Sequence, residues 1–307
     1  MTRRHNGHPS GRRPARLAPN FPGLALRAPM LRAPMLRAPM LRARMFLAYM
    51  LLACIILAAL PGWASAQSLD AMAEPPERNT LYQVSTIQAL LNGNYDGAVS
   101  FEELAAHGGF GIGTFHKLDG EMVALDGQFW QVTHNGRIKP VDGSMTTPFA
   151  AVTSFEPDLE LTLRYVKDLD DFTHRLEKEL PGRNMFYAIR VDGLIQYVKT
   201  RSVPAQEPPY PPLAEVTAHQ STFERENTVG TLVGFYTPEC AGTINVPGFH
   251  IHYLDEAREF GGHVLDLSSL EIVVKVDRTP NILVHMPLAT AGAELTDRSH
   301  ELDEVEK

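Results

Sequence analysis

The chain has 307 residues, with 28 Lys and Arg, 36 Asp and Glu, and two cysteines. Ten of the basic residues, all arginines, precede residue 45, whereas every acid follows residue 66, so residues 67–307 hold 18 basic against 36 acidic side chains, a net charge near −18. Such an acidic chain excludes nucleic-acid binding by phosphate neutralisation, and it is long enough to bury a sizeable core in one large or two small domains.

Residues 1–66 have the composition of a targeting segment. Arg27–Leu41 repeats Arg-Ala-Pro-Met-Leu, and proline at every fifth position prevents a regular helix. An apolar run over Met45–Leu60 and then Ala64-Ser65-Ala66 predict a secretory signal peptide, cleaved near Ala66-Gln67. We therefore expect an exported protein, periplasmic or extracellular, with no membrane attachment after cleavage. A retained anchor is the alternative, although the run falls short of the roughly 20 apolar residues that a span needs.

Cysteine usage constrains the mature chain. Cys54 leaves with the leader, so Cys240 stands alone and no intrachain disulfide can form. Cys240 lies ten residues before His250, so a thiolate metal ligand is a minor alternative.

Short elements separated by turns follow. Ser100-Phe101-Glu102-Glu103 is a capping box that predicts a short helix ending at Gly108-Gly109. Asp170 or Asp171 can cap a second helix through Leu180. Asp-Gly and Asn-Gly pairs predict hairpin turns at 119–120, 126–127, 135–136 and, between two strands over 185–200, at 192–193.

We expect an α+β fold with mixed or antiparallel β-sheets, few helices and two tightly associated subdomains. Pro204–Pro212 holds five prolines and is the best linker candidate. This divides the mature chain into an N-terminal α+β subdomain, residues 67–203, and a C-terminal metal-binding, β-rich subdomain, residues 204–307. Residues 231–237, 248–254, 264–276 and 282–287 of the latter are strand-like, and an acidic tail follows Ala289.

Three histidines carry the chemistry. On an extended strand His250 and His252 point to the same side, so both can reach one point. His263 begins a returning strand after Gly261-Gly262. Three imidazoles are a ligand set of catalytic zinc, which keeps a further position open for water or substrate.

Several blocks resemble the alpha-acetolactate decarboxylase family. They are Leu81–Thr86, Gly111–Phe115 with Leu118–Met122, Leu125–Gly127, Val198–Arg201, and Pro247–Tyr253 with Gly261–His263, all in the family's order. The resemblance covers nearly all of residues 80–288.

That resemblance implies a zinc enzyme, a carboxy-lyase that converts (S)-2-acetolactate to (R)-acetoin and carbon dioxide, acting as a homodimer. By position His250, His252 and His263 match the Zn²⁺ ligands, Glu121 an active-site glutamate and Arg201 the active-site arginine. A further glutamate comes from the family's C-terminal tail, where Glu304 and Glu306 are both candidates and Glu306 is preferred.

The chemistry of the reaction agrees with these roles. Decarboxylation of a 3-oxo acid leaves an electron pair that is delocalised on to the ketone oxygen. A metal that chelates the 2-hydroxyl and ketone oxygens stabilises the resulting enediolate as a Lewis acid. Arg201 can hold the carboxylate, or donate a proton through ordered water, and Glu121 can ligate the metal or shuttle the proton.

Two rival functions use the same histidines. His250-x-His252-x3-Glu256 has the ligand spacing of a first cupin motif, but Ile244 stands where the motif has glycine and no second motif follows. In that interpretation Glu256 is a ligand and His263 is incidental. The other rival is a non-catalytic, exported metal-binding protein.

Overall fold

The computed structural model describes residues 78–290 and 292–306. The predicted leader, with Cys54, lies outside these residues. Within them, no helix is long and apolar enough to cross a membrane. The α-helices are α2 (Ile87–Leu91), α3 (Phe101–Ala105), α4 (Leu169–Glu179), α5 (Leu213–Thr217) and α6 (Leu302–Val305). Short 3-10 helices cover His116–Leu118, Glu239–Ala241, Leu288–Thr290 and Ser299–Glu301.

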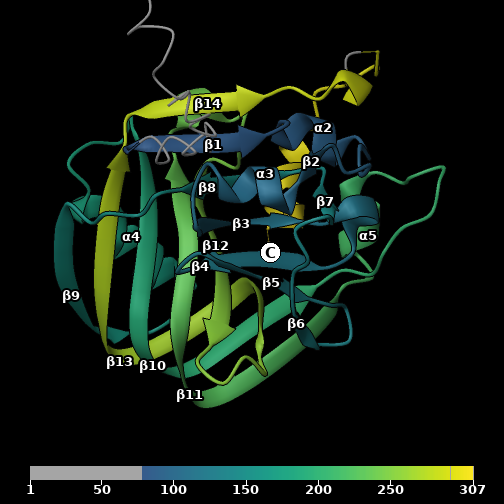
Figure 1. The fold of residues 1–307 in the computed structure, drawn as a ribbon. Helices are drawn as coiled ribbons and strands as arrows, with labels where there is room; N and C mark the ends of the chain where they lie inside the picture. The colour runs from purple at the N-terminus through teal and green to yellow at the C-terminus, as the bar shows by residue number, and fades with distance from the viewer. Residues whose placement is uncertain (1–77, 291, 307) are drawn as a thin grey trace, which may run out of the picture. The chain divides into compact units, whose positions relative to one another are not determined.

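Two large sheets organise the fold (Figure 1). The seven-stranded sheet has the order β14 (Asn281–His285), β1 (Thr80–Val84), β8 (Ala150–Thr153), β3 (Phe110–Thr114), β4 (Glu121–Leu125), β5 (Gln128–Val132) and β6 (Ile138–Pro140). The five-stranded sheet has the order β10 (Phe186–Ser202), β11 (Ser221–Thr237), β12 (Gly248–Asp255), β13 (Gly261–Thr279) and β9 (Leu159–Val166). A small ribbon pairs β2 (Val99–Ser100) with β7 (Thr146–Thr147). The pairing of β1 with β14 is parallel and the other pairings are antiparallel, so the expected α+β class with mixed sheets and few helices is confirmed.

The five-stranded sheet closes on itself. β10 pairs with β11 along one edge and with β13 along the other, and the short strand β12 joins β11 to β13 again. Between Lys199 and Thr200 the pairing with β13 shifts by one residue, because Lys199 lies opposite Asp266 whereas Thr200 lies opposite Val264. Leu265 is therefore the extra residue of a β-bulge.

The two sheets share a buried apolar cluster. Ile112, Val123 and Leu125 project from the seven-stranded sheet, and Val233 and Leu254 from the five-stranded one. Because side chains alternate along a strand, Glu121 lies on the same face of β4 as Val123 and Leu125. His250 and His252 share the face of Leu254 on β12 in the same way, so both sets of candidate residues point toward the interface between the sheets.

Strands from both sides of residues 203–204 contribute to each large sheet, since β14 joins the first and β10 the second. The proline-rich segment between β10 and α5 contains no helix or strand, as its composition predicts.

Local structure follows capping chemistry. The hydroxyl of Ser100 accepts from the backbone N–H of Glu103 and begins α3, as predicted. Helix α4 begins two or three residues earlier than predicted, because the carboxylate of Asp168, not that of Asp170 or Asp171, accepts from the N–H of Asp171. The helix α2 was not predicted, although the hydroxyl of Thr86 caps it by accepting from the N–H of Ala89.

The predicted hairpin turn at Asp192-Gly193 is wrong, because β10 continues through it as one strand of 17 residues. On one side β11 pairs with both Asp192 and Gly193, and on the other side β13 pairs with Asp192. The carboxylate of Asp192 accepts from Arg190, Thr231 and Lys275, side chains of all three strands. Long-range pairing and this charged cluster thus override the local turn preference.

Candidate metal centre

Three histidine side chains meet at one point. His250 and His252 lie two residues apart on β12, and His263 lies directly opposite His252 on β13. One ring nitrogen of each residue lies within 4.8 Å of the others, and the ring centroids are 5.0–5.4 Å apart. The strand periodicity and the returning strand therefore bring the three rings together as the sequence predicts, and they can hold a metal ion.

His252 and His263 are buried, His250 is half-buried, and the cluster is incompletely hydrogen-bonded. Within the described part of the chain, Nδ1 of His250, Nε2 of His252 and Nδ1 of His263 are buried nitrogens with no hydrogen-bond partner. Leaving a polar atom buried and unpaired is costly. A cation bound among the rings would use such lone pairs, so the donor set fits a metal.

Burial also sets the charge state of the rings. It lowers the pKa of His250 to about 3, with a smaller contribution from Arg201. The pKa values of His252 and His263 are likewise lowered well below the usual value, first by burial. The three imidazoles are therefore neutral near pH 7, and neutral imidazole is the form that binds metals.

The seven-stranded sheet orients one of these rings. Nδ1 of His252 lies 2.8 Å from the backbone carbonyl oxygen of Met122 on β4. A carbonyl oxygen can only accept, so Nδ1 must carry the proton and donate it. This leaves Nε2 unprotonated, with its lone pair free for a cation.

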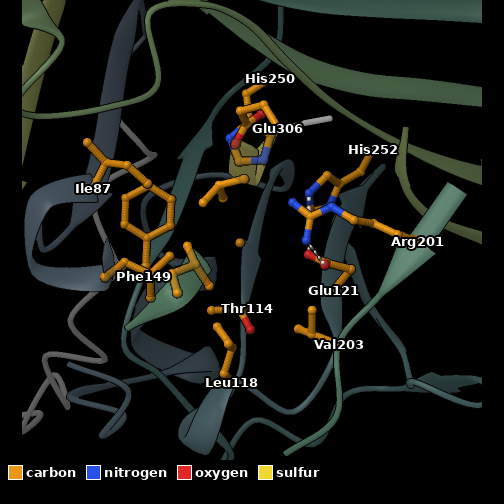
Figure 2. A pocket seen from close by; sticks show the side chains of 14 residues that line it. Ile87, Thr114, Leu118, Glu121, Phe149, Arg201, Val203, His250, His252 and Glu306 are labelled. Carbon is orange, nitrogen blue, oxygen red and sulfur yellow. Dashed lines mark hydrogen bonds and ion pairs between the residues drawn. The ribbon is translucent and has the colours of Figure 1, made fainter. Parts of the chain in front are cut away.

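A buried ion pair lies beside the histidines. Arg201 is the direct neighbour of His263 across β10 and β13, so Arg201, His263 and His252 occupy one cross-strand row. Nη1 of Arg201 lies 3.5 Å from Oε1 of Glu121, and both side chains are less than a tenth exposed. Oε2 of Glu121 lies 3.6 Å from Nε2 of His252 (Figure 2).

Glu121 is poised between two charge states. Burial raises the pKa of Glu121 to about 7, with Arg201 opposing the shift and Glu306 adding to it. Nε of Arg201 is buried without a hydrogen-bond partner among the described residues. The guanidinium therefore retains an N–H that can donate to a bound anion.

The C-terminal tail folds back to the cluster. Oε2 of Glu306, the residue after helix α6, lies 3.7 Å from Nε2 of His263. Burial raises the pKa of Glu306 to about 7, and Arg201 opposes this. Glu304 is exposed. Of the two tail glutamates considered from sequence, Glu306 is the one beside the histidines.

These groups line a cavity of about 40 Å³ together with apolar side chains (Figure 2), and we call the two sets its polar half and its apolar half by residue type. The polar half consists of Thr114, Glu121, Arg201, His250, His252 and Glu306. The apolar half includes Ile87, Leu90, Leu118, Phe149, Val203 and Val305. Apart from Leu118, which falls in a recognised block, sequence reasoning missed this apolar half, because its residues come from segments far apart in the chain.

A sequence comparison decides the family. The family model of the alpha-acetolactate decarboxylases matches residues 81–294. The chain belongs to the alpha-acetolactate decarboxylase family.

Relatives of this family match most of the chain. An alpha-acetolactate decarboxylase of Methanosarcina mazei is 49% identical over 232 residues, which are 75% of this chain and 81% of the relative. That of Bacillus licheniformis is 40% identical over 222 residues, 72% of this chain and 88% of the relative. The crystal structure of the enzyme from Bacillus subtilis strain 168 matches with a TM-score of 0.72 and 39% identity, covering 74% of this chain and 99% of that one.

Membership makes the chain an acetolactate decarboxylase, a carbon–carbon lyase, and it weakens the two rivals drawn from sequence. Glu256, the extra ligand of the cupin interpretation, is exposed in the turn after β12. Cys240 is exposed as well. Among the described residues, the group of potential ligands within 4.8 Å contains only the three histidines.

Proposed function

We propose that this decarboxylase converts (S)-2-acetolactate to (R)-acetoin and carbon dioxide with a zinc ion held by His250, His252 and His263. The observation that carries the proposal is the convergence of three neutral imidazoles, each with a buried and unpaired ring nitrogen. Imidazole nitrogens are ligands that zinc prefers. When bound, the ion supplies a Lewis acid for the 2-hydroxyl and ketone oxygens of the substrate, where negative charge develops.

Arg201 is proposed to hold the carboxylate of the substrate. Its guanidinium is buried in the cavity wall, and its Nε proton has no acceptor among the described residues. A buried guanidinium binds a carboxylate through charge-assisted hydrogen bonds. Since the carboxylate leaves as carbon dioxide, this contact orients the bond that breaks.

Glu121 is proposed to hold and deliver the proton that replaces carbon dioxide. A carboxyl group with a pKa of about 7 can carry a proton at neutral pH and release it at little cost. Its neighbour Arg201 cannot readily lose a proton, so the carboxyl group is the better donor. Glu306, at the other side of the histidines, is proposed as the third acidic group of the site, by its contact with His263.

The apolar half of the cavity suits the methyl groups of acetolactate. It also keeps water from the face of the substrate that lies against it, since Ile87, Phe149 and Val203 offer no proton. With Ile87 and Phe149 on one side of the cavity and Glu121 on the other (Figure 2), a planar intermediate would be protonated from one face. This arrangement supports a product of a single configuration.

Two further properties are proposed from sequence and family resemblance. Export after cleavage near Ala66-Gln67 predicts a mature N-terminus at Gln67, which N-terminal sequencing of secreted protein would detect. A homodimer predicts twice the chain mass in light scattering.

The test of the function is direct. Purified protein loaded with zinc is mixed with racemic acetolactate, and acetoin is followed by colour and resolved by chiral chromatography. We expect (R)-acetoin, and activity that disappears with a chelator and returns with zinc. Acetoin no faster than spontaneous decay would refute the proposal.

A further inference from the structure

The tail that carries Glu306 is attached to helix α2 by polar contacts that do not involve the histidines. We define residues 296–306 as the C-terminal strap. Leu302 and Val305 of the strap are buried in an apolar cluster with Ile87 and Leu213, and Val305 lines the cavity. Apolar contacts bury the strap, but they are not directional and do not specify where its end lies.

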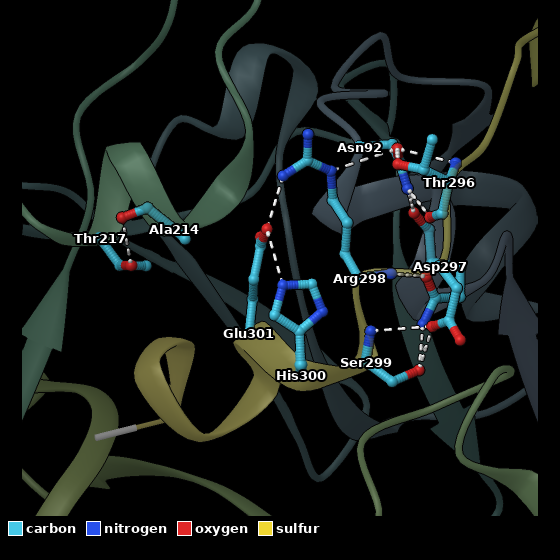
Figure 3. A network of polar contacts seen from close by, with 10 residues as sticks. Asn92, Ala214, Thr217, Thr296, Asp297, Arg298, Ser299, His300 and Glu301 are labelled. Carbon is cyan, nitrogen blue, oxygen red and sulfur yellow. Dashed lines mark hydrogen bonds and ion pairs between the residues drawn. The ribbon is translucent and has the colours of Figure 1, made fainter.

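Asn92, which follows the last residue of helix α2, binds the strap as a neighbouring strand would (Figure 3). Its Nδ2 donates to the carbonyl oxygen of Thr296 over 2.9 Å, and its Oδ1 accepts from the backbone N–H of Thr296 over 3.1 Å. Oδ1 also accepts from the Thr296 hydroxyl, and Nδ2 donates to the carbonyl oxygen of Gln88. The amide is thereby fixed to its helix and satisfied in both directions.

Gln88, one helical turn earlier, makes the second attachment. Its Oε1 accepts from the backbone N–H of Arg298 over 3.0 Å, and its Nε2 donates to the hydroxyl of Ser299 over 2.8 Å. Arg298 then reaches Glu301 with Nη1 over 2.6 Å and Asn92 with Nε over 3.4 Å. Three of these hydrogen bonds go to backbone atoms of the strap. They therefore depend on where the strap lies and not on which side chains it carries.

Helix α2 thus connects two parts of the site. Its polar side chains Gln88 and Asn92 bind the strap, whereas Ile87 and Leu90 line the cavity. Neither Gln88 nor Asn92 lines the cavity or belongs to the histidine group.

We propose that Gln88 and Asn92 are positioning residues that hold the C-terminal strap so that the carboxylate of Glu306 lies against His263. This rests on the proposed function, because Glu306 is the group through which they act. Loss of either amide releases the start of the strap, whose end then no longer fixes Glu306. Misplacing one catalytic group by about 1 Å can cost on the order of 100-fold in rate.

The test uses the full chain loaded with zinc and the variants Asn92→Ala, Gln88→Ala, Glu306→Gln and the pair Asn92→Ala with Glu306→Gln. Gln128→Ala removes an exposed amide on β5 and serves as the matched control. We expect Asn92→Ala to lower kcat by roughly 10- to 100-fold, with KM changed much less and zinc content unchanged. The pair should be no slower than Glu306→Gln alone, because both changes remove the same contribution.

Two further measurements separate positioning from general destabilisation. Hydrogen exchange at residues 296–306 should accelerate in Asn92→Ala, whereas exchange in β10 and β13 should not. Asn92→Asp keeps the acceptor for the Thr296 N–H and for Arg298, and we expect it to recover most of the rate.

The outcomes distinguish the two proposals. Wild-type protein that makes no acetoin would refute the proposed function itself. An active wild type with Asn92→Ala equal to Gln128→Ala, or with losses that multiply in the pair, would overturn the positioning role alone. A fall in zinc content that matches the fall in rate would overturn it too.

Discussion

Nδ1 of His252 on one sheet lies 2.8 Å from the carbonyl oxygen of Met122 on the other. Since backbone carbonyls do not move independently of their strand, the ring of His252 is oriented by the packing of the two sheets. A hydrogen bond of this kind to a metal-ligating histidine fixes its tautomer and commonly affects metal affinity by 10- to 100-fold.

We expect His250→Ala and His252→Ala each to lose the metal and the activity, because each removes one of only three imidazoles. Atomic absorption should find well under one tenth of the wild-type zinc, and acetoin formation should fall by at least about 1,000-fold. His219→Ala removes an exposed histidine and is the control. Full zinc in either strand variant would contradict the ligand assignment.

Arg201→Ala should separate metal binding from turnover. The guanidinium contacts Glu121 but offers no lone pair to a cation, so zinc content should remain near that of the wild type. We expect kcat/KM to fall by roughly 100-fold, and Arg201→Lys to recover part of it, since lysine keeps the charge but not the planar fork. Turnover is measured by steady-state kinetics and zinc content by atomic absorption. Equal losses of both would show that Arg201 supports the fold instead.

Glu256→Gln tests the cupin interpretation. Glu256 is exposed in the turn after β12 and outside the histidine group. Zinc content and kcat should therefore stay within about twofold of the wild type, because exposed substitutions away from a site rarely change stability by more than about 0.5 kcal/mol. Loss of both zinc and activity would make Glu256 a ligand and return the cupin interpretation.

Asp277 predicts a pH-dependent stability. Its carboxyl group is fully buried, and burial with the nearby Asp158 raises its pKa to about 7, while Arg78 and Arg278 oppose the shift. The folded state therefore binds the proton more tightly than the unfolded chain, and the free energy of unfolding falls as the pH rises from about 4 to about 7. Asp277→Asn removes this loss.

We expect Asp277→Asn to be more stable than the wild type by on the order of 2 kcal/mol at pH 8, and to gain little at pH 4. Urea unfolding of variant and wild type at the two pH values measures the difference in the free energy of unfolding. The titration of the active-site groups is the same in both proteins and cancels in this difference. Asp142→Asn should behave oppositely at high pH, because hydrogen bonds from Ser144 lower the pKa of Asp142. A gain from Asp277→Asn that is equal at both pH values would refute the titration.

The sequence was informative where local periodicity determines direction. The spacing of His250 and His252 places both on one face of a strand in any sheet, and the short connection from β12 to β13 brings His263 opposite His252. Glu121, Arg201 and Glu306 came from family resemblance, since each is an ordinary surface charge by its local context. The apolar half of the cavity was beyond both approaches, apart from Leu118 in a recognised block.

The errors arose where distant contacts compete with local preference. Asp192-Gly193 has the residues of a hairpin turn, but strands more than 35 residues away pair on both sides of it. Helix α2 spans only five residues, which is too few for a periodic pattern to appear. Its stability comes from the apolar cluster on one side and the hydrogen bonds to the strap on the other.

The bulge at Leu265 has a consequence for length variation. On its N-terminal side His263 faces the site. On its C-terminal side β13 continues for fourteen residues, some of which pack in the core. A bulge lets these two stretches differ in phase, so this point can absorb an insertion or deletion of one residue. The same change elsewhere in the strand would turn His263 away from Arg201. Natural decarboxylases of different length should therefore vary at this bulge or in the turns, and sequence alignment of the strand can check this.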